Sequence, residues 1–374
     1  MLYLDNSATT QILPAVKEAM LPYLLEEFGN PSSKYYSLAE KASKAVKEAR
    51  EQVSRLIGCN ADEVIFTSGA TESNNMIIKG IVDFYGDSNK HIITSKTEHP
   101  SVLETCRYLE QKGFRVTYLD VDRYGRIDLV QLANILETPP LLVSIMWGNN
   151  EIGSLNQIKE ISKLCVEKDV FFHTDATQVI GKVPVDLNQE GFEGVQFLSC
   201  SAHKFHGPKG IGVAVIKKDE LGLRQKITPL LHGGGQEYDY RSGTLPVHNI
   251  VGMGKAAELA FFNLYNNVEK LKTLESYLQD ILLDKFGEVI QFNHDSTDKI
   301  PGILSVQFQG VNNETLIKTL SPIVAVSTGS ACSSTKPSHV LQAIGLSMEE
   351  IRSTIRFSLS HLIDKTDLDI FDRL

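Results

Sequence analysis

The sequence lacks closely spaced cysteines, a long apolar run and an excess of positive charge. Its five cysteines (Cys59, Cys106, Cys165, Cys200 and Cys332) are scattered and form no C-x-x-C pair. That pattern argues against a disulfide framework or a structural zinc site and is typical of the reducing cytoplasm. We therefore predict a cytoplasmic protein without a bound metal.

No stretch of the chain has the composition of a membrane segment. No apolar run approaches the roughly 18 residues that a membrane-spanning helix requires, and the N-terminus carries no basic-then-apolar signal sequence. The formal net charge of −9 argues against a general nucleic-acid or anionic-membrane surface. We therefore expect no membrane association and no direct binding of nucleic acid.

The chain is long enough for more than one core. Its 374 residues, 42% of them hydrophobic, are typical of roughly two domains. Apolar strands alternate with helices over the first part of the chain, at 63–68, 91–95, 115–119, 141–147, 170–175, 195–199 and 211–216. Several are apolar throughout, which indicates a mixed, mostly parallel sheet covered on both faces by helices. The fold class is therefore α/β.

A second set of elements follows a long helix that is expected from about Asn249 towards Lys285. Its strands and helix are expected at 303–308, 323–327 and 353–360, and from Glu314 onward. This set predicts a smaller α+β domain that also takes in the extreme N-terminus. The predicted large domain is 14–257, and the predicted small domain is 1–13 with 258–374.

Lys204 lies between an apolar run that ends at Leu198 and a Gly-Pro-Lys-Gly turn at 207–210. A lysine held where a buried strand gives way to such a turn is a candidate Schiff-base nucleophile, because desolvation lowers the amine pKa. The alternative is an exposed loop lysine, which is the commoner case. His203 and His206 flank Lys204, but no third ligand is spaced nearby for a zinc site.

Other polar residues follow the predicted strands, at whose carboxyl ends the sites of such folds gather. Asp175 follows an apolar strand and could be a metal ligand, a helix N-cap or the partner of a buried cation. Gln178 would share its face. His99 also follows a strand, and a structural histidine is the alternative to a functional one.

The segment that begins with Gly69, Ala70 and Thr71 follows a strand and opens a helix. Backbone N–H groups at such a helix start bind phosphate, and the Thr71 hydroxyl would add a donor. The spacing is not that of a P-loop, which disfavours a nucleoside triphosphate. Alternatively, Ser68 or Thr71 caps the helix.

Two residues late in the chain have unusual surroundings. Cys332 lies among small residues in a predicted loop, so its sulfur is approachable, whereas the other cysteines lie in or beside helix and strand patterns. Arg356 is a single arginine inside an apolar strand. Its guanidinium suits a carboxylate ligand, and an internal salt bridge is the alternative.

Taken together, these motifs resemble those of the NifS/IscS-type cysteine desulfurases, pyridoxal-phosphate enzymes of the class V aminotransferase group. The resemblance covers nearly the whole chain. The motifs that carry it are YLDNSATT, GNPSS, SGATESNN, TEHPSV, NNEIG, HTDATQ, SAHKFHGPKG, HGGG, RSGTLPVHNIVGMG, STGSACSS and IRFSLS. It implies the type I fold of pyridoxal-phosphate-dependent transferases, with pyridoxal 5'-phosphate as cofactor.

The resemblance implies that L-cysteine is converted to L-alanine while Cys332 becomes a persulfide that passes its sulfur to an acceptor protein. Lys204 would hold the cofactor as a Schiff base and move protons. Asp175 would pair with the ring nitrogen, which makes the ring an electron sink. Gln178 would contact the ring hydroxyl, and His99 would stack on the ring and help to move protons.

The remaining implied roles concern the phosphate and the substrate. Asn150 would contact the cofactor and, with Arg356, the substrate carboxylate. The residues implied to hold the phosphate are Ala70, Thr71, Ser201 and His203, joined by Thr244 of a second subunit. The resemblance thus implies a homodimer.

The chain departs from the family pattern after GNPSS, where it has Lys34-Tyr35-Tyr36 and the family usually has histidine. It departs again after HGGG, where Tyr238-Asp239 replaces the usual Arg-Gly. The segment from Cys332 to Pro337 is shorter than in relatives that serve iron–sulfur scaffolds. The acceptor pathway therefore stays open among iron–sulfur assembly, tRNA thiolation and DNA phosphorothioation. Alternative functions are a selenocysteine lyase or aminotransferase of the same fold, or a non-catalytic sulfur carrier or scaffold.

Overall fold

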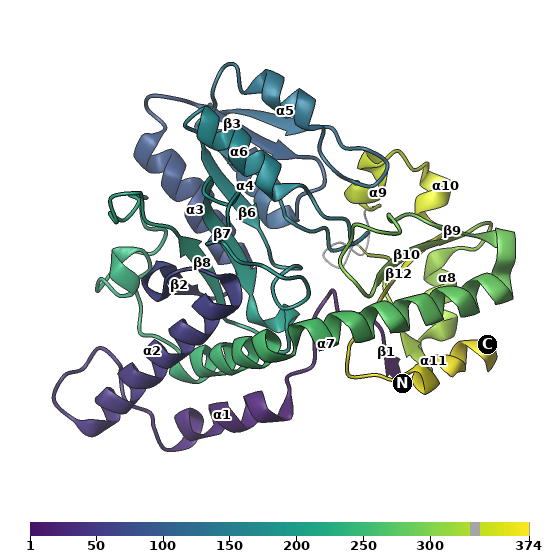
Figure 1. Ribbon diagram of the computed structural model, residues 1–374, viewed down its shortest axis with the longest axis horizontal. Helices are drawn as coiled ribbons and strands as arrows, with labels where there is room; N and C mark the ends of the chain where they lie inside the picture. Colours follow the sequence, from purple (N-terminus) through teal and green to yellow (C-terminus); the bar gives the residue numbers. More distant parts are fainter. Residues whose placement is uncertain (330–336, 374) are drawn as a thin grey trace.

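The computed structural model describes residues 1–329 and 337–373. In this part of the chain, a seven-stranded sheet and a three-stranded sheet lie at opposite ends of the molecule, and a long helix, α7, connects them (Figure 1). A further two-stranded pair joins the N-terminus to the smaller sheet's end of the molecule.

The large sheet has the strand order β2-β8-β7-β6-β5-β3-β4. Its strands are β2 (Val64–Thr67), β3 (His91–Ser95), β4 (Arg115–Leu119), β5 (Leu142–Ser144), β6 (Phe171–Asp175), β7 (Val195–Ser201) and β8 (Gly212–Ile216). Strand β8 runs antiparallel to both neighbours, and all other pairings in this sheet are parallel. The predicted mixed, mostly parallel sheet is confirmed.

Both faces of the large sheet are buried, as the apolar strands predicted. On β2, Val64 and Phe66 lie in one hydrophobic core, whereas Ile65 lies in a second core on the other face. The helices that precede the long connection are α1 (Pro14–Leu25), α2 (Ser37–Ile57), α3 (Ala70–Tyr85), α4 (Pro100–Glu110), α5 (Leu129–Ile135) and α6 (Ile158–Glu167). Helices α2 and α6 contribute to the first core, and α3 and α4 to the second.

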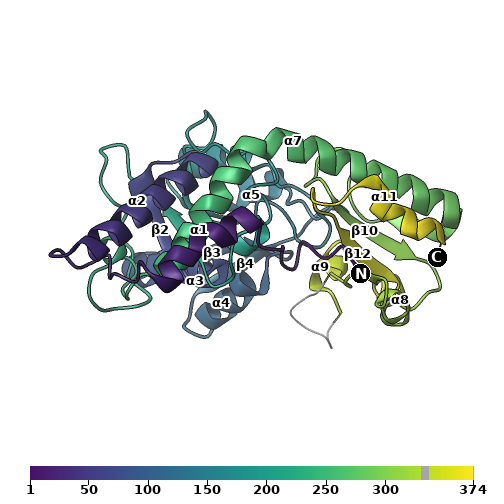
Figure 2. The same ribbon diagram turned by 90° about the horizontal axis from the view of Figure 1, so that it is seen from below.

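Helix α7 (Val247–Phe286) has 40 residues and is therefore about 60 Å long. Its first half packs on α1 and α2, and its second half lies beside the small sheet and α11 (Figure 2). Accordingly, Ile250 belongs to the first core of the large sheet, and Leu274 belongs to the core of the small sheet. The predicted domain boundary at 257/258 falls inside this continuous helix, and the division into domains stays a prediction.

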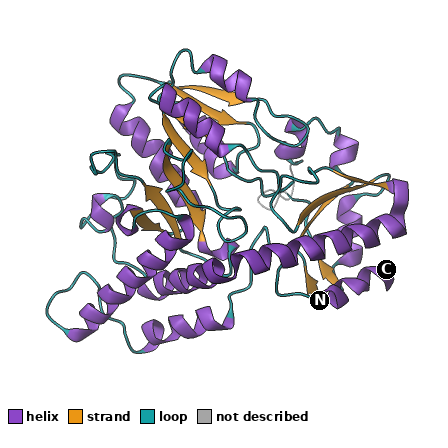
Figure 3. Cartoon of the chain, in the orientation of Figure 1, coloured by secondary structure: helices purple, strands orange, loops and turns teal. Residues whose placement is uncertain are grey.

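The small end of the molecule contains the antiparallel sheet β12-β10-β9, seen to the right of the large sheet in Figure 3. Its strands and helices are β9 (Ile290–Phe292), β10 (Ile303–Phe308), α8 (Asn313–Leu320), β11 (Val324–Ala325), α9 (His339–Ala343), α10 (Met348–Ile351), β12 (Thr354–Ser358) and α11 (Lys365–Leu368). Strand β1 (Leu2–Tyr3) pairs in parallel with β11. The first residues of the chain therefore lie at the small end.

A strained turn is fixed to α2 by a buried ion pair. Glu237, Tyr238 and Asp239 are consecutive non-glycine residues with φ of 51°, 58° and 70°, a conformation that costs of order 1–3 kcal/mol per residue. The Arg50 guanidinium donates to both oxygens of the Glu237 carboxylate, at 2.5 and 2.9 Å. The Phe66 amide donates to the same carboxylate at 2.7 Å. These bonds offset the strain and fix the turn against β2.

We expect Glu237→Ala to lower the free energy of unfolding by about 3–5 kcal/mol, because it leaves the buried Arg50 guanidinium without a counter-charge. Urea denaturation followed by circular dichroism measures this change. Glu48→Ala is the matched control, since it removes the exposed ion pair with Lys44 on the same helix and should cost less than about 1 kcal/mol. Equal losses in the two variants would show that the buried pair does not hold the turn.

Candidate active site

A cavity of about 440 Å³ lies where the strands of the large sheet end. Its walls come from the segments that follow β2, β3, β5, β6 and β7, with contributions from the N-terminus and the small end. It brings together most of the predicted site residues, namely Ala70, Thr71, His99, Asn150, Asp175, Gln178, Ser201, His203, Lys204 and Arg356. Its volume is within the range of small-molecule and cofactor sites.

Of the predicted site residues, one is not described and one lies elsewhere. Cys332 lies outside the described residues. Thr244 is exposed and does not line the cavity of its own chain. Its role in a second subunit's site stays a prediction.

Lys204 ends a short 3-10 helix, Ala202–Lys204, directly after β7. Its ammonium group donates to the backbone carbonyls of Ser7 at 2.6 Å and Ala8 at 2.8 Å. Next to it, the ring of His203 is hydrogen-bonded to the Thr9 hydroxyl at 3.1 Å. Lys204 is therefore half-buried in the cavity, and the N-terminal segment positions its amine.

Asp175 ends β6 and is almost fully buried. Its carboxylate accepts hydrogen bonds from the Asn74 side chain at 2.8 Å and from the Thr177 amide at 2.9 Å. The same Asn74 amide group contacts the Ser101 hydroxyl at 2.8 Å. No helix begins at Asp175, so the N-cap alternative is wrong. Both of these donors to the carboxylate are neutral, which leaves it suited to a cation in the cavity.

His99 is both a helix cap and a wall of the cavity. It is the N-cap of α4, and its Nδ1 accepts from the Ser101 amide at 3.1 Å. Because Nδ1 is an acceptor, the neutral ring carries its proton on Nε2. Burial lowers the pKa of His99 below its ordinary value, which favours this neutral form.

Gln178 is oriented by a lysine that sequence analysis did not single out. Lys182 donates to the Gln178 side-chain oxygen at 3.0 Å, and the Gln178 amide nitrogen donates to the Ser7 carbonyl at 2.9 Å. An ammonium group can only donate, so Lys182 fixes which end of the amide is the oxygen. Burial lowers the pKa of Lys182 to about 7, and the charges of Lys204 and Arg356 contribute. The four-residue spacing from Gln178 was the available signal.

The start of α3 has the geometry of an anion cradle. Helix α3 has 16 residues and begins at Ala70, so its first N–H groups have no intrahelical partners. Gly69, with φ of 153°, approaches β8 so closely that a Cβ on Gly212 would lie 2.6 Å from the Gly69 Cα. Ser201 and His203 complete this side of the cavity. Burial and the adjacent Lys204 lower the pKa of His203 to about 4.

These residues fit pyridoxal 5'-phosphate. The helix start suits a phosphate, the Asp175 carboxylate suits a protonated ring nitrogen, and Lys204 supplies a primary amine in the same cavity. In addition, the buried hydroxyls of Ser7 and Thr177 have no hydrogen-bond partner among the described residues. The donor set therefore agrees with the cofactor that the resemblance implies.

Arg356 makes the internal ion pair that was the alternative to ligand binding. One terminal nitrogen donates to the Asp5 carboxylate at 2.5 Å. The other donates to the carbonyls of Asn150 at 2.9 Å and Gly329 at 3.2 Å. Within the described chain, the buried Nε is the guanidinium nitrogen without a partner. Arg356 lines the cavity, and its binding of a substrate carboxylate stays a prediction.

Sequence analysis also missed two buried carboxyl groups beside the cavity. Glu98 accepts from the Ser95 hydroxyl and the Met146 amide, both at 2.8 Å, and burial raises its pKa to about 8. Glu151, in the NNEIG motif, accepts from the Ser338 hydroxyl at 2.5 Å, and burial raises its pKa too. Their signal was an acidic residue close after a predicted strand end.

Several similar proteins are named as cysteine desulfurases or NifS-like proteins. The family Aminotransferase class-V matches residues 2–371. "Cysteine desulfurase IscS" of Rickettsia prowazekii (strain Madrid E) is 46% identical over 374 residues, which cover 98% of this chain and 88% of the relative. A solved "NifS-like protein" is 36% identical, with a TM-score of 0.91 over 100% of this chain and 97% of its own. A structure titled "SspA in complex with cysteine" is also 36% identical, with a TM-score of 0.84 over 96% and 99% of the two chains.

The chain therefore belongs to the aminotransferase class-V family and shares the fold of the NifS-like protein. Within that family it is a pyridoxal-phosphate-dependent cysteine desulfurase, which confirms the predicted activity in preference to a non-catalytic carrier. Separately, none of the helices in the described ranges is long and apolar enough to cross a membrane.

We expect Glu98→Gln to become more stable relative to the parent protein as pH rises. Between the ordinary glutamate pKa of 4.5 and the raised value of about 8, the folded state holds a proton that the unfolded state has lost. The parent protein therefore loses stability with rising pH, and the amide variant does not, so the difference should grow by roughly 2–3 kcal/mol between pH 5 and pH 7.

Urea denaturation of the two holoenzymes at several pH values measures this difference. Glu104→Gln is the control, because it removes a carboxylate from the exposed side of α4 and should leave the difference constant with pH. A pH-independent result for Glu98→Gln would mean that Glu98 is ionised in the folded protein.

Proposed function

We propose that the chain converts L-cysteine to L-alanine and receives the sulfur on Cys332 as a persulfide. The observation that carries the proposal is the meeting of Lys204 and the buried Asp175 carboxylate in one cavity at the strand ends. An amine and a carboxylate in that relation suit a cofactor with an aldehyde at one position and a basic ring nitrogen at another.

The residues would divide the binding of the cofactor and substrate between them. When bound, pyridoxal phosphate supplies an electron sink that makes the Cα–H bond of the amino acid acidic. The Ala70 and Thr71 amides would bind its phosphate, together with Ser201 and His203. Asn150 would contact the cofactor and lie next to the substrate carboxylate, which Arg356 would bind through its unpartnered Nε–H.

Proton transfer and sulfur transfer would then use different residues. Lys204 is the base that takes the Cα proton and later returns it, and the carbonyls of Ser7 and Ala8 hold its ammonium form in between. The Cys332 thiolate attacks the substrate sulfur. A sulfur–sulfur bond forms as the carbon–sulfur bond breaks, the electron pair stays with carbon, and the methylene takes a proton. The enzyme thiol and cysteine thus yield an enzyme persulfide and alanine.

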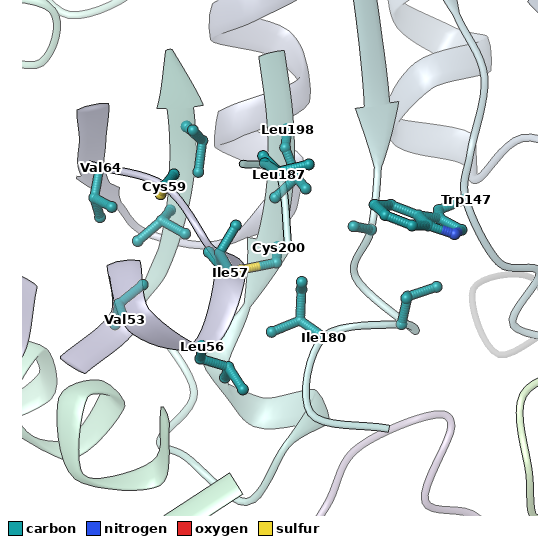
Figure 4. Packing of buried hydrophobic residues seen from close by; sticks show 14 of the residues in the cluster. Val53, Leu56, Ile57, Cys59, Val64, Trp147, Ile180, Leu187, Leu198 and Cys200 are labelled. Atoms are coloured by element: carbon teal, nitrogen blue, oxygen red, sulfur yellow. The ribbon is translucent and has the colours of Figure 1, made fainter. Parts of the chain in front are cut away.

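Burial of the other cysteines supports Cys332 as the nucleophile. Cys59, Cys106, Cys165 and Cys200 are all buried free thiols. Cys59 and Cys200, which belongs to β7, lie within the packed core of the large sheet (Figure 4). Burial raises the thiol pKa of both, and it raises those of Cys106 and Cys165 to about 12. Thiols of this kind are not ionised at neutral pH and do not react.

Iodoacetamide should therefore add a single label per chain to the folded holoenzyme, on Cys332, because the other thiols are neither exposed nor ionised. Mass spectrometry of the intact and digested protein measures the number and position of labels. Labelling in urea is the control and should reach all five cysteines. Labelling of a second cysteine in the folded protein would remove this support.

Cys332→Ser should keep the visible absorbance of the bound cofactor and reduce alanine production from L-cysteine to near background. A serine hydroxyl is not ionised at neutral pH and cannot accept sulfur. Ser334→Ala, in the same segment, is the control and should retain activity. Undiminished sulfur transfer by Cys332→Ser would refute the assignment of the nucleophile.

The partners and location are also part of the proposal. The chain would form a homodimer in which Thr244 reaches the other subunit's phosphate site. Thr244 is exposed and does not line the cavity of its own chain, which is consistent with this role. The buried free thiols suit a cytoplasmic protein. The acceptor is a protein whose pathway stays open, and co-purification followed by sulfur-transfer assays would identify it.

A further inference from the structure

A second cavity, of about 280 Å³, lies on the other side of Lys204 from the substrate-side cavity. Lys204 and Ser7 line both cavities. The other walls of the second cavity come from the turn after β6, the middle of α7 and the segment that follows β12. Nothing in the proposed reaction uses this space.

The charged side chains in the walls of the second cavity are all basic. Lys182 and Lys204 line it together with His206 and His361, whose pKa values burial lowers, so these two rings are neutral near pH 7. None of the described residues that line it is an aspartate or glutamate. Lys182 donates to the neutral Gln178 amide and has no ion-pair partner in the described chain. The ammonium of Lys182, a half-buried residue, therefore lacks a counter-ion within the described chain.

The remaining walls are mainly apolar and include asparagine side chains. Leu13, Leu259, Val268 and Leu271 face this space, and Asn267 lies among them on α7. The Ser7 hydroxyl is almost fully buried and has no hydrogen-bond partner among the described residues. A ligand that satisfies these groups carries a negative charge at one end and an apolar stem at the other.

We propose that this cavity binds a short-chain monocarboxylate, with its carboxylate against the Lys182 ammonium and its alkyl stem against the leucines of α7. Burying a cation without a counter-charge is unfavourable, and a bound carboxylate supplies that charge together with a charge-assisted hydrogen bond. The volume accommodates a ligand of a few carbons, since a cavity of roughly 150 Å³ holds benzene.

Binding has a consequence for the reaction. Lys182 and Lys204 repel each other as ammonium groups, and an anion beside them stabilises the charged form of both. Lys204 must be an uncharged base to take the Cα proton, so the bound carboxylate slows turnover. This consequence rests on the proposed function, whereas binding itself does not.

Fluorine NMR of 4,4,4-trifluorobutyrate with the holoenzyme tests the binding directly. We expect a saturable bound signal whose affinity falls at least tenfold in Lys182→Met, because a charge-assisted hydrogen bond contributes about 1.5–3 kcal/mol. Lys255→Met is the matched control, since it removes a lysine from α7 that pairs with Glu258 and does not line the cavity. That variant should bind like the parent protein.

Lys182→Met also removes the hydrogen bond that orients Gln178, so a second variant is needed to test the cavity alone. Val268→Phe fills the cavity from α7, leaves every charge in place and should also abolish binding. The visible absorbance of each holoenzyme confirms that it is folded and loaded. The proposal is wrong if trifluorobutyrate shows no saturable binding, or if its affinity is unchanged in both cavity variants. If both variants lose binding but trifluorobutyrate does not change turnover, the binding site is confirmed and the proposed effect on Lys204 is wrong.

Discussion

The rest of the site depends on the hydrogen bonds between the Lys204 ammonium and the carbonyls of Ser7 and Ala8. These carbonyls can reach the lysine only because the preceding residues are fixed to the small end of the molecule. Strand β1 pairs with β11, the Asp5 carboxylate accepts from Arg356, and the Asn6 side chain donates to the Ser358 carbonyl at 2.9 Å. One short segment therefore connects the amine, the small sheet and the arginine proposed to bind substrate.

Burial, more than ion pairing, determines the protonation of the groups around this segment. It raises the pKa of Glu98 to about 8 and lowers that of His203 to about 4, so both groups are mainly neutral near pH 7. Asp175 accepts from Asn74 and Thr177. In such a site the Asp175 carboxylate is available to a cationic ring, and the histidines act as neutral hydrogen-bond donors and acceptors.

The sequence predicted the sheet well, because buried parallel strands are short apolar runs. The strands at His91–Ser95, Arg115–Leu119 and Ile303–Phe308 have the predicted bounds. Strand β5 ends at Ser144, earlier than predicted, although the apolar run continues to Trp147. Apolar composition indicates which residues are buried but not which are hydrogen-bonded to a neighbouring strand, so it could not show where β5 ends.

The site was predicted less completely than the sheet, because local sequence patterns do not show contacts between residues far apart in the chain. The predicted site residues that directly follow strands were identified from local sequence patterns, and most of them line one cavity. Asn74 and Ser101 were missed because their value lies in contacts with residues far along the chain, 101 positions away in the case of Asn74 and Asp175. The internal ion pair of Arg356 joins residues 351 positions apart. Local patterns carry no information about such pairs.

That separation has a consequence for synthesis of the protein. The segment that holds Lys204 leaves the ribosome long before Arg356 and Ser358, to which it is fixed, because 351 and 352 positions separate the two bonded pairs. Until then the early residues have neither their strand partner nor their ion pair, and loop-closure entropy opposes their docking. A nascent chain can therefore build the large sheet while its lysine still lacks a fixed position, and competence to bind the cofactor is acquired only after translation has passed Ser358.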